Sequence, residues 1–114
     1  MAGQPVEVYV VNSGAEAVEN MLKYFINLHQ QRMQELGCTP RSKRFIYFDQ
    51  AFHGRTVFTL NITQLANDPL ATRDYQGIIP GNLQVPFPAW DHSRSDAENE
   101  QELDACLVEI ESLM

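Results

Sequence analysis

Three small residues, Ser13-Gly14-Ala15, stand where an apolar run ends and a long helical pattern begins. The start of a helix leaves several backbone N–H groups without partners and carries the positive end of the helix dipole. Gly14 lets a phosphate approach the backbone closely, Ser13 adds a hydroxyl donor, and Ala15 does not obstruct its own amide. These residues suit a phosphate ester, although small residues at a helix start more often form only a tight turn with an N-cap.

A second group of candidates, Phe52-His53-Gly54, follows another apolar run. If both runs are strands of one parallel sheet, the two groups lie at its carboxyl-end edge, where α/β proteins bind ligands. There Phe52 could stack on a flat heterocycle and His53 could donate a hydrogen bond. Taken alone, Phe52 is more often a core residue, and the role of the neighbouring Arg55 stays open.

Other site chemistries find little support in the sequence. Neither a G-x-G-x-x-G nor a G-x-x-x-x-G-K-[ST] string occurs, which argues against a dinucleotide or triphosphate site. The three histidines, His29, His53 and His92, lack the spacing of metal ligands, so no metal site is expected. The acidic residues near the C-terminus favour a solvated helix face over acid–base catalysis. They are Asp96, Glu98, Glu100, Glu102 and Asp104.

Three apolar runs predict the strands that would position these loops. Residues 6–11 are β-branched and aromatic, and predict a strand buried on both faces of a parallel sheet. Residues 45–48 predict the next strand, reached by a right-handed crossover. Residues 83–87 predict a third, which Pro86 limits in length. This pattern is typical of an α/β fold with a mostly parallel sheet.

The longest predicted helix covers residues 15 to about 36, where apolar side chains recur at helical spacing. The stripe consists of Val18, Met21, Leu22, Phe25, Leu28, His29, Met33 and Leu36. Gly37 supplies a left-handed cap and Pro40 prevents the helix from resuming. Glu19 and Lys23 are expected to form an ion pair one turn apart.

The second half of the chain predicts a short helix within 55–63, a long surface loop over 66–82 with a helical turn, and a final helix. Ser95 and Glu98 form a capping box at the start of that final helix. Its expected apolar face consists of Leu103, Cys106, Leu107 and Ile110. A helix after a third strand normally leads to a fourth, so residues 1–114 are expected to form a single, partial domain.

Composition narrows the class of protein. Hydrophobic residues make up 44% and charged residues 20% of the 114 positions, which argues against disordered and fibrous classes. No membrane partner is expected, because no apolar run approaches the roughly 20 residues of a membrane helix; without a targeting signal, a cytoplasmic location is expected. The formal net charge of −7 argues against nucleic acid as a partner. Cys38 and Cys106 form no metal or redox motif and are expected to be buried or half-buried.

Together, two segments resemble the N-terminal motifs of class III pyridoxal-phosphate-dependent aminotransferases. The first runs from Val10 to Asn20 and contains Asn12-Ser13-Gly14-Ala15-Glu16-Ala17, and the second is Ala51-Phe52-His53-Gly54-Arg55-Thr56. Their order and spacing are also similar to that family over residues 6–64, and the remainder fits more loosely. The resemblance implies a three-layer α/β/α large domain with a seven-stranded, mostly parallel sheet, of which this chain supplies a part.

The resemblance also implies a set of residues that bind pyridoxal 5′-phosphate. They are Ser13, Gly14, Ala15, Phe52, His53 and Gly54. In the family, the amides at Gly14 and Ala15 hold the cofactor phosphate, Phe52 stacks on the pyridine ring, and the remaining residues complete these walls. Many relatives have Thr at the position of Ala15, so this chain lacks one hydroxyl contact and is expected to bind the phosphate slightly less tightly.

Transamination needs a lysine that forms a Schiff base with the cofactor, a carboxylate on its pyridine nitrogen and groups that hold the substrate carboxylate. In the family these lie later in the chain, and a second subunit completes the phosphate site, which implies a homo-oligomer. Lys23 and Lys43 are the chain's two lysines, and both are expected away from the strand-end edge. The sequence therefore predicts no catalytic residue and an inactive isolated chain.

The reaction implied for the parent enzyme transfers an amino group from an amine or amino acid to a keto acid. Residues 17–23 and 75–77 are most similar to the lysine 6-aminotransferase branch. Two other interpretations stay open. One is a non-catalytic module that binds an anion or associates with itself through exposed apolar surface, and the other is an unrelated doubly wound α/β domain whose turn residues are structural.

Overall fold

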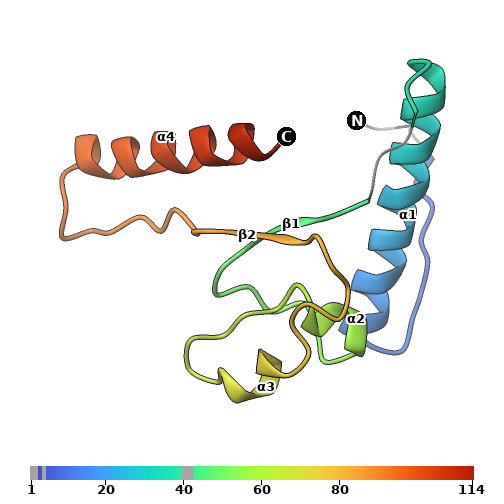
Figure 1. Ribbon diagram of the computed structural model, residues 1–114, viewed down its shortest axis with the longest axis horizontal. Helices are drawn as coiled ribbons and strands as arrows, with labels where there is room; N and C mark the ends of the chain where they lie inside the picture. The colour runs from blue at the N-terminus through green and yellow to red at the C-terminus, as the bar shows by residue number, and fades with distance from the viewer. Residues whose placement is uncertain (1–2, 4, 40–42) are drawn as a thin grey trace.

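The computed structural model describes residues 3, 5–39 and 43–114. Along them lie α1 (Gly14–Glu35), β1 (Ile46–Phe48), α2 (Val57–Leu60), α3 (Leu70–Arg73), β2 (Leu83–Val85) and α4 (Asp96–Leu113). The strands pair in parallel, with Ile46 beside Leu83 and Phe48 beside Val85. In Figure 1, α4 lies above the strands, α2 and α3 below them, and α1 to one side. The predicted α/β class with a parallel sheet is confirmed.

The two long helices begin and end where their local sequence predicts. The side chain of Ser13 caps α1, and both halves of the Ser95–Glu98 capping box are present at the start of α4. After α1, Gly37 adopts φ 66°, and the amides of Gly37 and Cys38 donate back to carbonyls of the last turn. This arrangement satisfies carbonyl groups that a helix end leaves free. Pro40, the other predicted stop signal, lies outside the described residues.

The prediction of a strand over residues 6–11 is wrong. Val6, Val8, Tyr9 and Val10 are 79–85% exposed, and residues 5–11 make no backbone hydrogen bond to any described residue. Such residue types favour an extended backbone, but a strand exists only when a neighbouring strand supplies its hydrogen bonds. Here β1 pairs with β2, so there is no crossover from residues 6–11 to β1. We refer to residues 5–11 as the N-terminal arm.

The predicted pairing within α1 is also wrong. The carboxylate of Glu19 accepts a hydrogen bond from Thr56, and the ammonium group of Lys23 lies 3.5 Å from Oδ1 of Asn20. Glu19 thus pairs with the half-buried hydroxyl of Thr56. The spacing along α1 suggests the exposed Lys23 instead. Cys38 differs from expectation too, because the turn after α1 leaves it exposed, whereas Cys106 is buried as predicted.

The predicted apolar faces are covered only in part. On α1, Leu22 is buried whereas Phe25 and His29 are exposed, because α2 packs against only a short part of the helix. On α4, Cys106 is buried against the end of β2, where its thiol lies 3.2 Å from the carbonyl oxygen of Pro86. Leu103 and Leu107 on the same helix stay exposed. Much apolar surface is therefore left open to solvent.

The buried core centres on α2 and the residues that follow it. Its hydrophobic members are Leu22, Leu60, Ile62, Val85 and Cys106. Thr59, Asn61 and Thr63 are buried beside them, and Asn61 bonds both the carbonyl of Val57 and the amide of Ile79. Asn61 thereby ties the long loop to α2. No helix in the described part of the chain combines the length and apolarity that crossing a bilayer requires.

Candidate functional site

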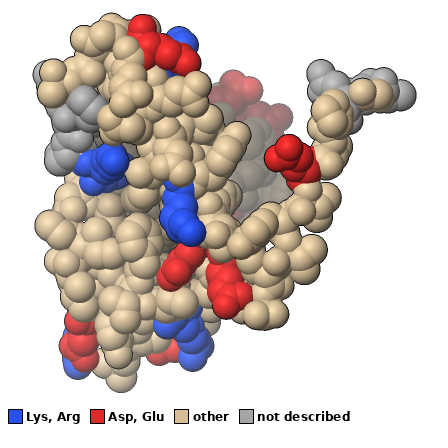
Figure 2. Space-filling model, turned by 90° about the vertical axis from the view of Figure 1, so that its right-hand side faces the viewer, with Lys and Arg blue, Asp and Glu red and all other residues tan. Residues whose placement is uncertain are grey.

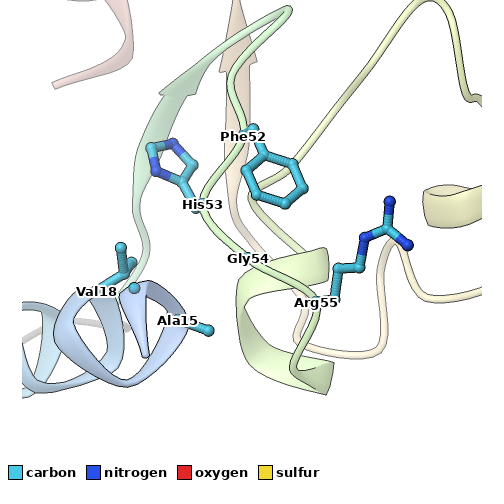
Figure 3. A pocket seen from close by; sticks show the side chains of 7 residues that line it. Ala15, Val18, Phe52, His53, Gly54 and Arg55 are labelled. Carbon is cyan, nitrogen blue, oxygen red and sulfur yellow. The ribbon is translucent and has the colours of Figure 1, made fainter. Parts of the chain in front are cut away.

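The start of α1 and the loop before α2 enclose a shallow, open hollow of about 340 Å³. Its lining residues are Gly14, Ala15, Val18, Phe52, His53, Gly54 and Arg55. Five of the six predicted site residues are therefore brought together, and the sixth, Ser13, directly precedes them as the helix cap. Figure 3 shows Ala15 projecting from α1 toward the Gly54 loop. Val18 and Arg55 are additional lining residues that the motifs did not mark as site residues.

One side of the hollow presents the amino terminus of α1. The amide of Glu16 donates to Oγ of Ser13 (3.2 Å), and the amide of Ala17 donates to the Ser13 carbonyl (3.1 Å). The amides of Gly14 and Ala15 have no acceptor among the described residues. Two free N–H donors thus stand at the positive end of the helix dipole, which is the arrangement that binds phosphate at helix starts.

Gly54 brings the loop into direct contact with α1. Its φ is +130°, and a Cβ built on it would lie 2.7 Å from Cβ of Ala15 and 2.9 Å from Oγ1 of Thr59. Contacts this short do not occur between real side-chain carbons, and this backbone conformation is nearly restricted to glycine. Any other residue would push the loop off the helix and widen the hollow.

Phe52 faces the hollow because the loop backbone is held from behind. The amide of His53 donates to Oγ1 of Thr63 (3.0 Å), and the amide of Gln64 donates to the carbonyl of Ala51 (3.0 Å). With the backbone fixed on that side, the Phe52 side chain points outward and is 54% exposed. The interpretation of Phe52 as a core residue is therefore wrong, and its ring is available for stacking.

His53 and Arg55 give the hollow its polar character. His53 is half-buried, and desolvation lowers the pKa of its imidazole below 6.5, so the ring is neutral at pH 7. Arg55 is exposed and forms no ion pair within the described residues. In Figure 3, His53 lies on the side of Val18, and Arg55 lies on the side of Phe52. An unpaired guanidinium beside a hollow suits an anionic group.

No side-chain amine lies at the hollow. Lys23 contacts Asn20 on α1, Lys43 is exposed ahead of β1, and neither lines the hollow. Clusters of three or more His, Cys, Asp or Glu side chains suited to a metal ion are also absent from residues 3, 5–39 and 43–114. The hollow therefore offers anion donors, an aromatic face and one cation, and its lining residues include no lysine that could form a Schiff base.

Comparison with known families shows which family the chain belongs to. The model of the family described as Aminotransferase class-III matches residues 1–114. The chain belongs to this family. Class III aminotransferases depend on pyridoxal 5′-phosphate. The predicted family and its cofactor are thereby confirmed, whereas the role of each lining residue stays a prediction.

Several curated relatives are similar to part of the chain. An ornithine aminotransferase from Oceanobacillus iheyensis is 37% identical over 81 residues, which are 71% of this chain and 19% of that protein. A putative [LysW]-aminoadipate semialdehyde/glutamate semialdehyde transaminase from Pyrococcus furiosus is 38% identical over 80 residues, 70% of this chain and 18% of its own length. The chain thus spans about a fifth of the length of these relatives.

The fold is also similar to a solved structure. A mutant of M. tuberculosis Rv3290C superposes with a TM-score of 0.75 over 90% of this chain and 23% of that one, at 22% sequence identity. At this identity the likeness concerns the fold alone. It indicates that most of this chain has a fold that is also part of a larger protein.

Proposed function

We propose that the hollow binds pyridoxal 5′-phosphate within an aminotransferase that moves an amino group from an amino acid or amine to a keto acid. The observation that carries this proposal is the meeting of two free amides, at Gly14 and Ala15, with the exposed ring of Phe52. A phosphate ester joined to a flat heterocycle needs both features a short distance apart. Gly54 keeps them together by allowing the loop to contact Ala15.

Five of the lining residues have distinct parts in this proposal. The amides of Gly14 and Ala15 bind the phosphate, and Phe52 orients the pyridine ring and excludes water from one of its faces. When bound, the cofactor supplies the electron sink that transamination requires. His53, neutral at pH 7, completes the wall without adding charge. Arg55 offers a guanidinium to the carboxylate of an amino-acid or keto-acid substrate.

The remaining chemistry is assigned to parts of the enzyme outside this chain. The hollow has no amine that could bind the cofactor covalently, so we expect residues 1–114 alone to bind without turnover. The names of several relatives, which are ornithine and acetylornithine aminotransferases, favour ornithine-like donors, and the lysine 6-aminotransferase branch stays a prediction from motif resemblance. A homo-oligomeric parent enzyme belongs to the same proposal.

A titration with pyridoxine 5′-phosphate tests the proposal. This ligand keeps the phosphate and ring but has no aldehyde, so it cannot react with Lys23 or Lys43. We expect saturable binding that shifts the NMR signals of the Gly14 and Ala15 amides. Inorganic phosphate and pyridoxine without phosphate should each bind at least about tenfold less tightly, because each makes only part of the contacts.

Two variants and two matched controls locate the binding. Gly14→Asp places a carboxylate beside the free amides, and Phe52→Ala removes the stacking face, so each should weaken binding at least about tenfold. Asn27→Asp adds the same charge on an exposed part of α1, and Phe87→Ala removes a ring that, like Phe52, is 54% exposed. Both controls should bind normally. Equal weakening by controls and site variants would refute the proposed site.

Turnover is a separate measurement. Incubation with pyridoxal 5′-phosphate, an amino acid and a keto acid should give no amino transfer by this chain. Borohydride reduction followed by mass analysis identifies any lysine that has reacted. Catalytic amino transfer together with an adduct at Lys23 or Lys43 would contradict the expected inactivity.

A second candidate function is a non-catalytic module that binds anions or associates with itself. The exposed apolar residues of the N-terminal arm favour self-association. The same titration distinguishes the two functions. Inorganic phosphate that binds as tightly as pyridoxine 5′-phosphate, with no effect of Phe52→Ala, would favour the anion-binding module.

A further inference from the structure

Three threonines lie on one face of the segment around α2: Thr56 caps its start, Thr59 lies within it and Thr63 follows it. Thr56, Thr59 and Thr63 stand at positions i, i+3 and i+7, and Thr59 and Thr63 are 0% and 1% exposed. An amphipathic helix normally places aliphatic side chains at such positions. Buried hydroxyl groups destabilise a fold unless they form hydrogen bonds. The partners of these hydroxyls therefore indicate what the threonines do.

The three threonines form a connected set of hydrogen bonds, in which the backbone carbonyl of Thr59 links Thr63 to Thr59, and the Oγ1 atoms of Thr56 and Thr59 lie 2.9 Å apart. Oγ1 of Thr63 donates to the carbonyl of Thr59 (2.7 Å) and accepts from the amide of His53 (3.0 Å). Oγ1 of Thr59 accepts from the amide of Thr56 (3.0 Å). The Thr56 hydroxyl then donates to the carboxylate of Glu19 on α1. Because a carboxylate only accepts, the set runs from the His53 loop and ends on α1.

The loop therefore meets α1 at two places. Gly54 contacts Ala15 at the start of the helix, and Thr56, two residues later, bonds Glu19 one helical turn further along. A single contact would leave the loop free to pivot, whereas two contacts one turn apart fix its direction as well. The direction of the loop sets where Phe52 points relative to the amides of Gly14 and Ala15.

We infer that Glu19 is a positioning residue, which acts through the threonines of α2 to hold the Phe52 loop against the start of α1. Glu19 is not itself one of the residues that line the hollow. Its effect on ligand binding rests on the proposed function, but its effect on the loop does not. Glu19 thus gives the phosphate half and the ring half of the hollow one fixed geometry.

Hydrogen exchange in the ligand-free chain tests the link itself. The reporter is the His53 amide, whose acceptor is Thr63. Thr56→Val removes the hydrogen bond to the carboxylate and should speed exchange of the His53 amide about tenfold, whereas Glu19→Gln keeps a neutral acceptor and should speed it by a smaller factor. The double variant should exchange no faster than Thr56→Val alone, because the side chain of Glu19 acts only through the Thr56 hydroxyl. Thr56→Ser keeps the hydroxyl and should restore the wild-type rate.

Glu35→Gln is the matched control, since it removes the same charge from an exposed position on α1. Circular dichroism verifies that every variant retains its helices. Unchanged His53 exchange in Glu19→Gln and Thr56→Val would overturn the inference. So would equal acceleration in Glu35→Gln.

Ligand affinity distinguishes a positioning role from a purely structural one, because loss of stability alone would not change the affinity for one ligand and spare the other. Thr56→Val, which changes no charge, should weaken pyridoxine 5′-phosphate about tenfold and leave the affinity for inorganic phosphate unchanged, because only the two-part ligand needs the fixed geometry. Equal weakening of both ligands would overturn the positioning role. If wild-type chain fails to bind pyridoxine 5′-phosphate, the proposed function fails, and the exchange rates alone decide the role of Glu19.

Discussion

At the scale of single residues, the contact between Gly54 and Ala15 joins the two motif segments. The absence of a side chain at Gly54 lets the loop reach the helix start, and the methyl group of Ala15 fills the space that remains. The two segments are far apart in the sequence, yet the free amides of one and the aromatic ring of the other line the same hollow. Position 54 therefore requires glycine for two reasons: its positive φ, and the lack of space for a Cβ beside Ala15.

Substitution of Gly54 by Ala separates these two requirements when it is compared with Gly77→Ala. Gly77 also has a positive φ (+83°), but a Cβ there meets nothing within 4 Å. Gly77→Ala should cost about 1 kcal/mol of unfolding free energy from backbone strain alone. Gly54→Ala adds the overlap with Ala15 and should cost about 3 kcal/mol. Urea unfolding followed by circular dichroism measures both losses of unfolding free energy. Equal losses would mean that the neighbours of Gly54 shift to accommodate a Cβ at little cost.

At the scale of elements, the sequence predicts what local interactions determine. Ser13, Gly37 and the Ser95–Glu98 pair mark helix ends because a cap acts on backbone only a few residues away. The strand predicted over 83–87 exists but ends at Val85, because Pro86 has no N–H to donate to a neighbouring strand. The N-terminal arm was mispredicted because strand formation depends on a partner that local sequence does not specify.

The same distinction applies to the candidate site. Two motifs were enough to predict five residues that line one hollow. The outward direction of Phe52 depends on Thr63, and the partner of Glu19 is Thr56 on another helix. Neither contact has a spacing rule in the sequence. Arg55 lies within the second motif segment, directly after three predicted site residues, and that position was the one signal for its place at the hollow.

The capping box of α4 gives an element-scale prediction for pH. The amide of Ser95 and then its hydroxyl donate to the carboxylate of Glu98 and hold the pKa of Glu98 below 4.5. The contribution of this carboxylate to stability is therefore present above pH 4.5 and is lost as the pH falls through the folded-state pKa. Glu98→Gln retains an acceptor but cannot titrate, so its helix signal should fall less between about pH 5 and pH 3.

Glu100→Gln provides the comparison for this measurement, because it removes the same charge from an exposed position on α4. Its circular dichroism should follow the wild-type pH curve apart from a small, even offset. If Glu98→Gln and Glu100→Gln follow the same curve, the capping box contributes nothing specific to α4.

At the scale of the whole molecule, the chain exposes more surface than its mass requires. Its accessible area is 8912 Å², whereas a compact monomer of 13.0 kDa exposes about 6,300 Å². Its radius of gyration is 17.1 Å, against about 13 Å for a compact domain of this length. Figure 2 shows the N-terminal arm as a narrow column standing away from the body. The excess area includes apolar side chains suited to burial against other chains.

We expect this surface to make the chain associate with itself, and we expect the N-terminal arm to contribute most. Val8 and Val10 are 79% and 85% exposed on a backbone with no hydrogen-bond partner among the described residues, which is the state of an unprotected strand edge. The combined variant Val8→Lys with Val10→Lys should dissociate about tenfold more readily, since burying two valines contributes at least about 1.5 kcal/mol. Sedimentation velocity over a range of concentrations measures the change.

The matched control is Leu70→Lys combined with Val108→Lys, which replaces residues that are 67% and 64% exposed on α3 and α4. Both double variants change the net charge from −7 by the same two units, so altered charge repulsion cancels between them. Association that weakens in the arm variant alone identifies the arm as the contact. The arm combines exposed valines with backbone groups that have no hydrogen-bond partner among the described residues. Equal weakening in both variants would mean that general apolar exposure, and not the arm, drives association.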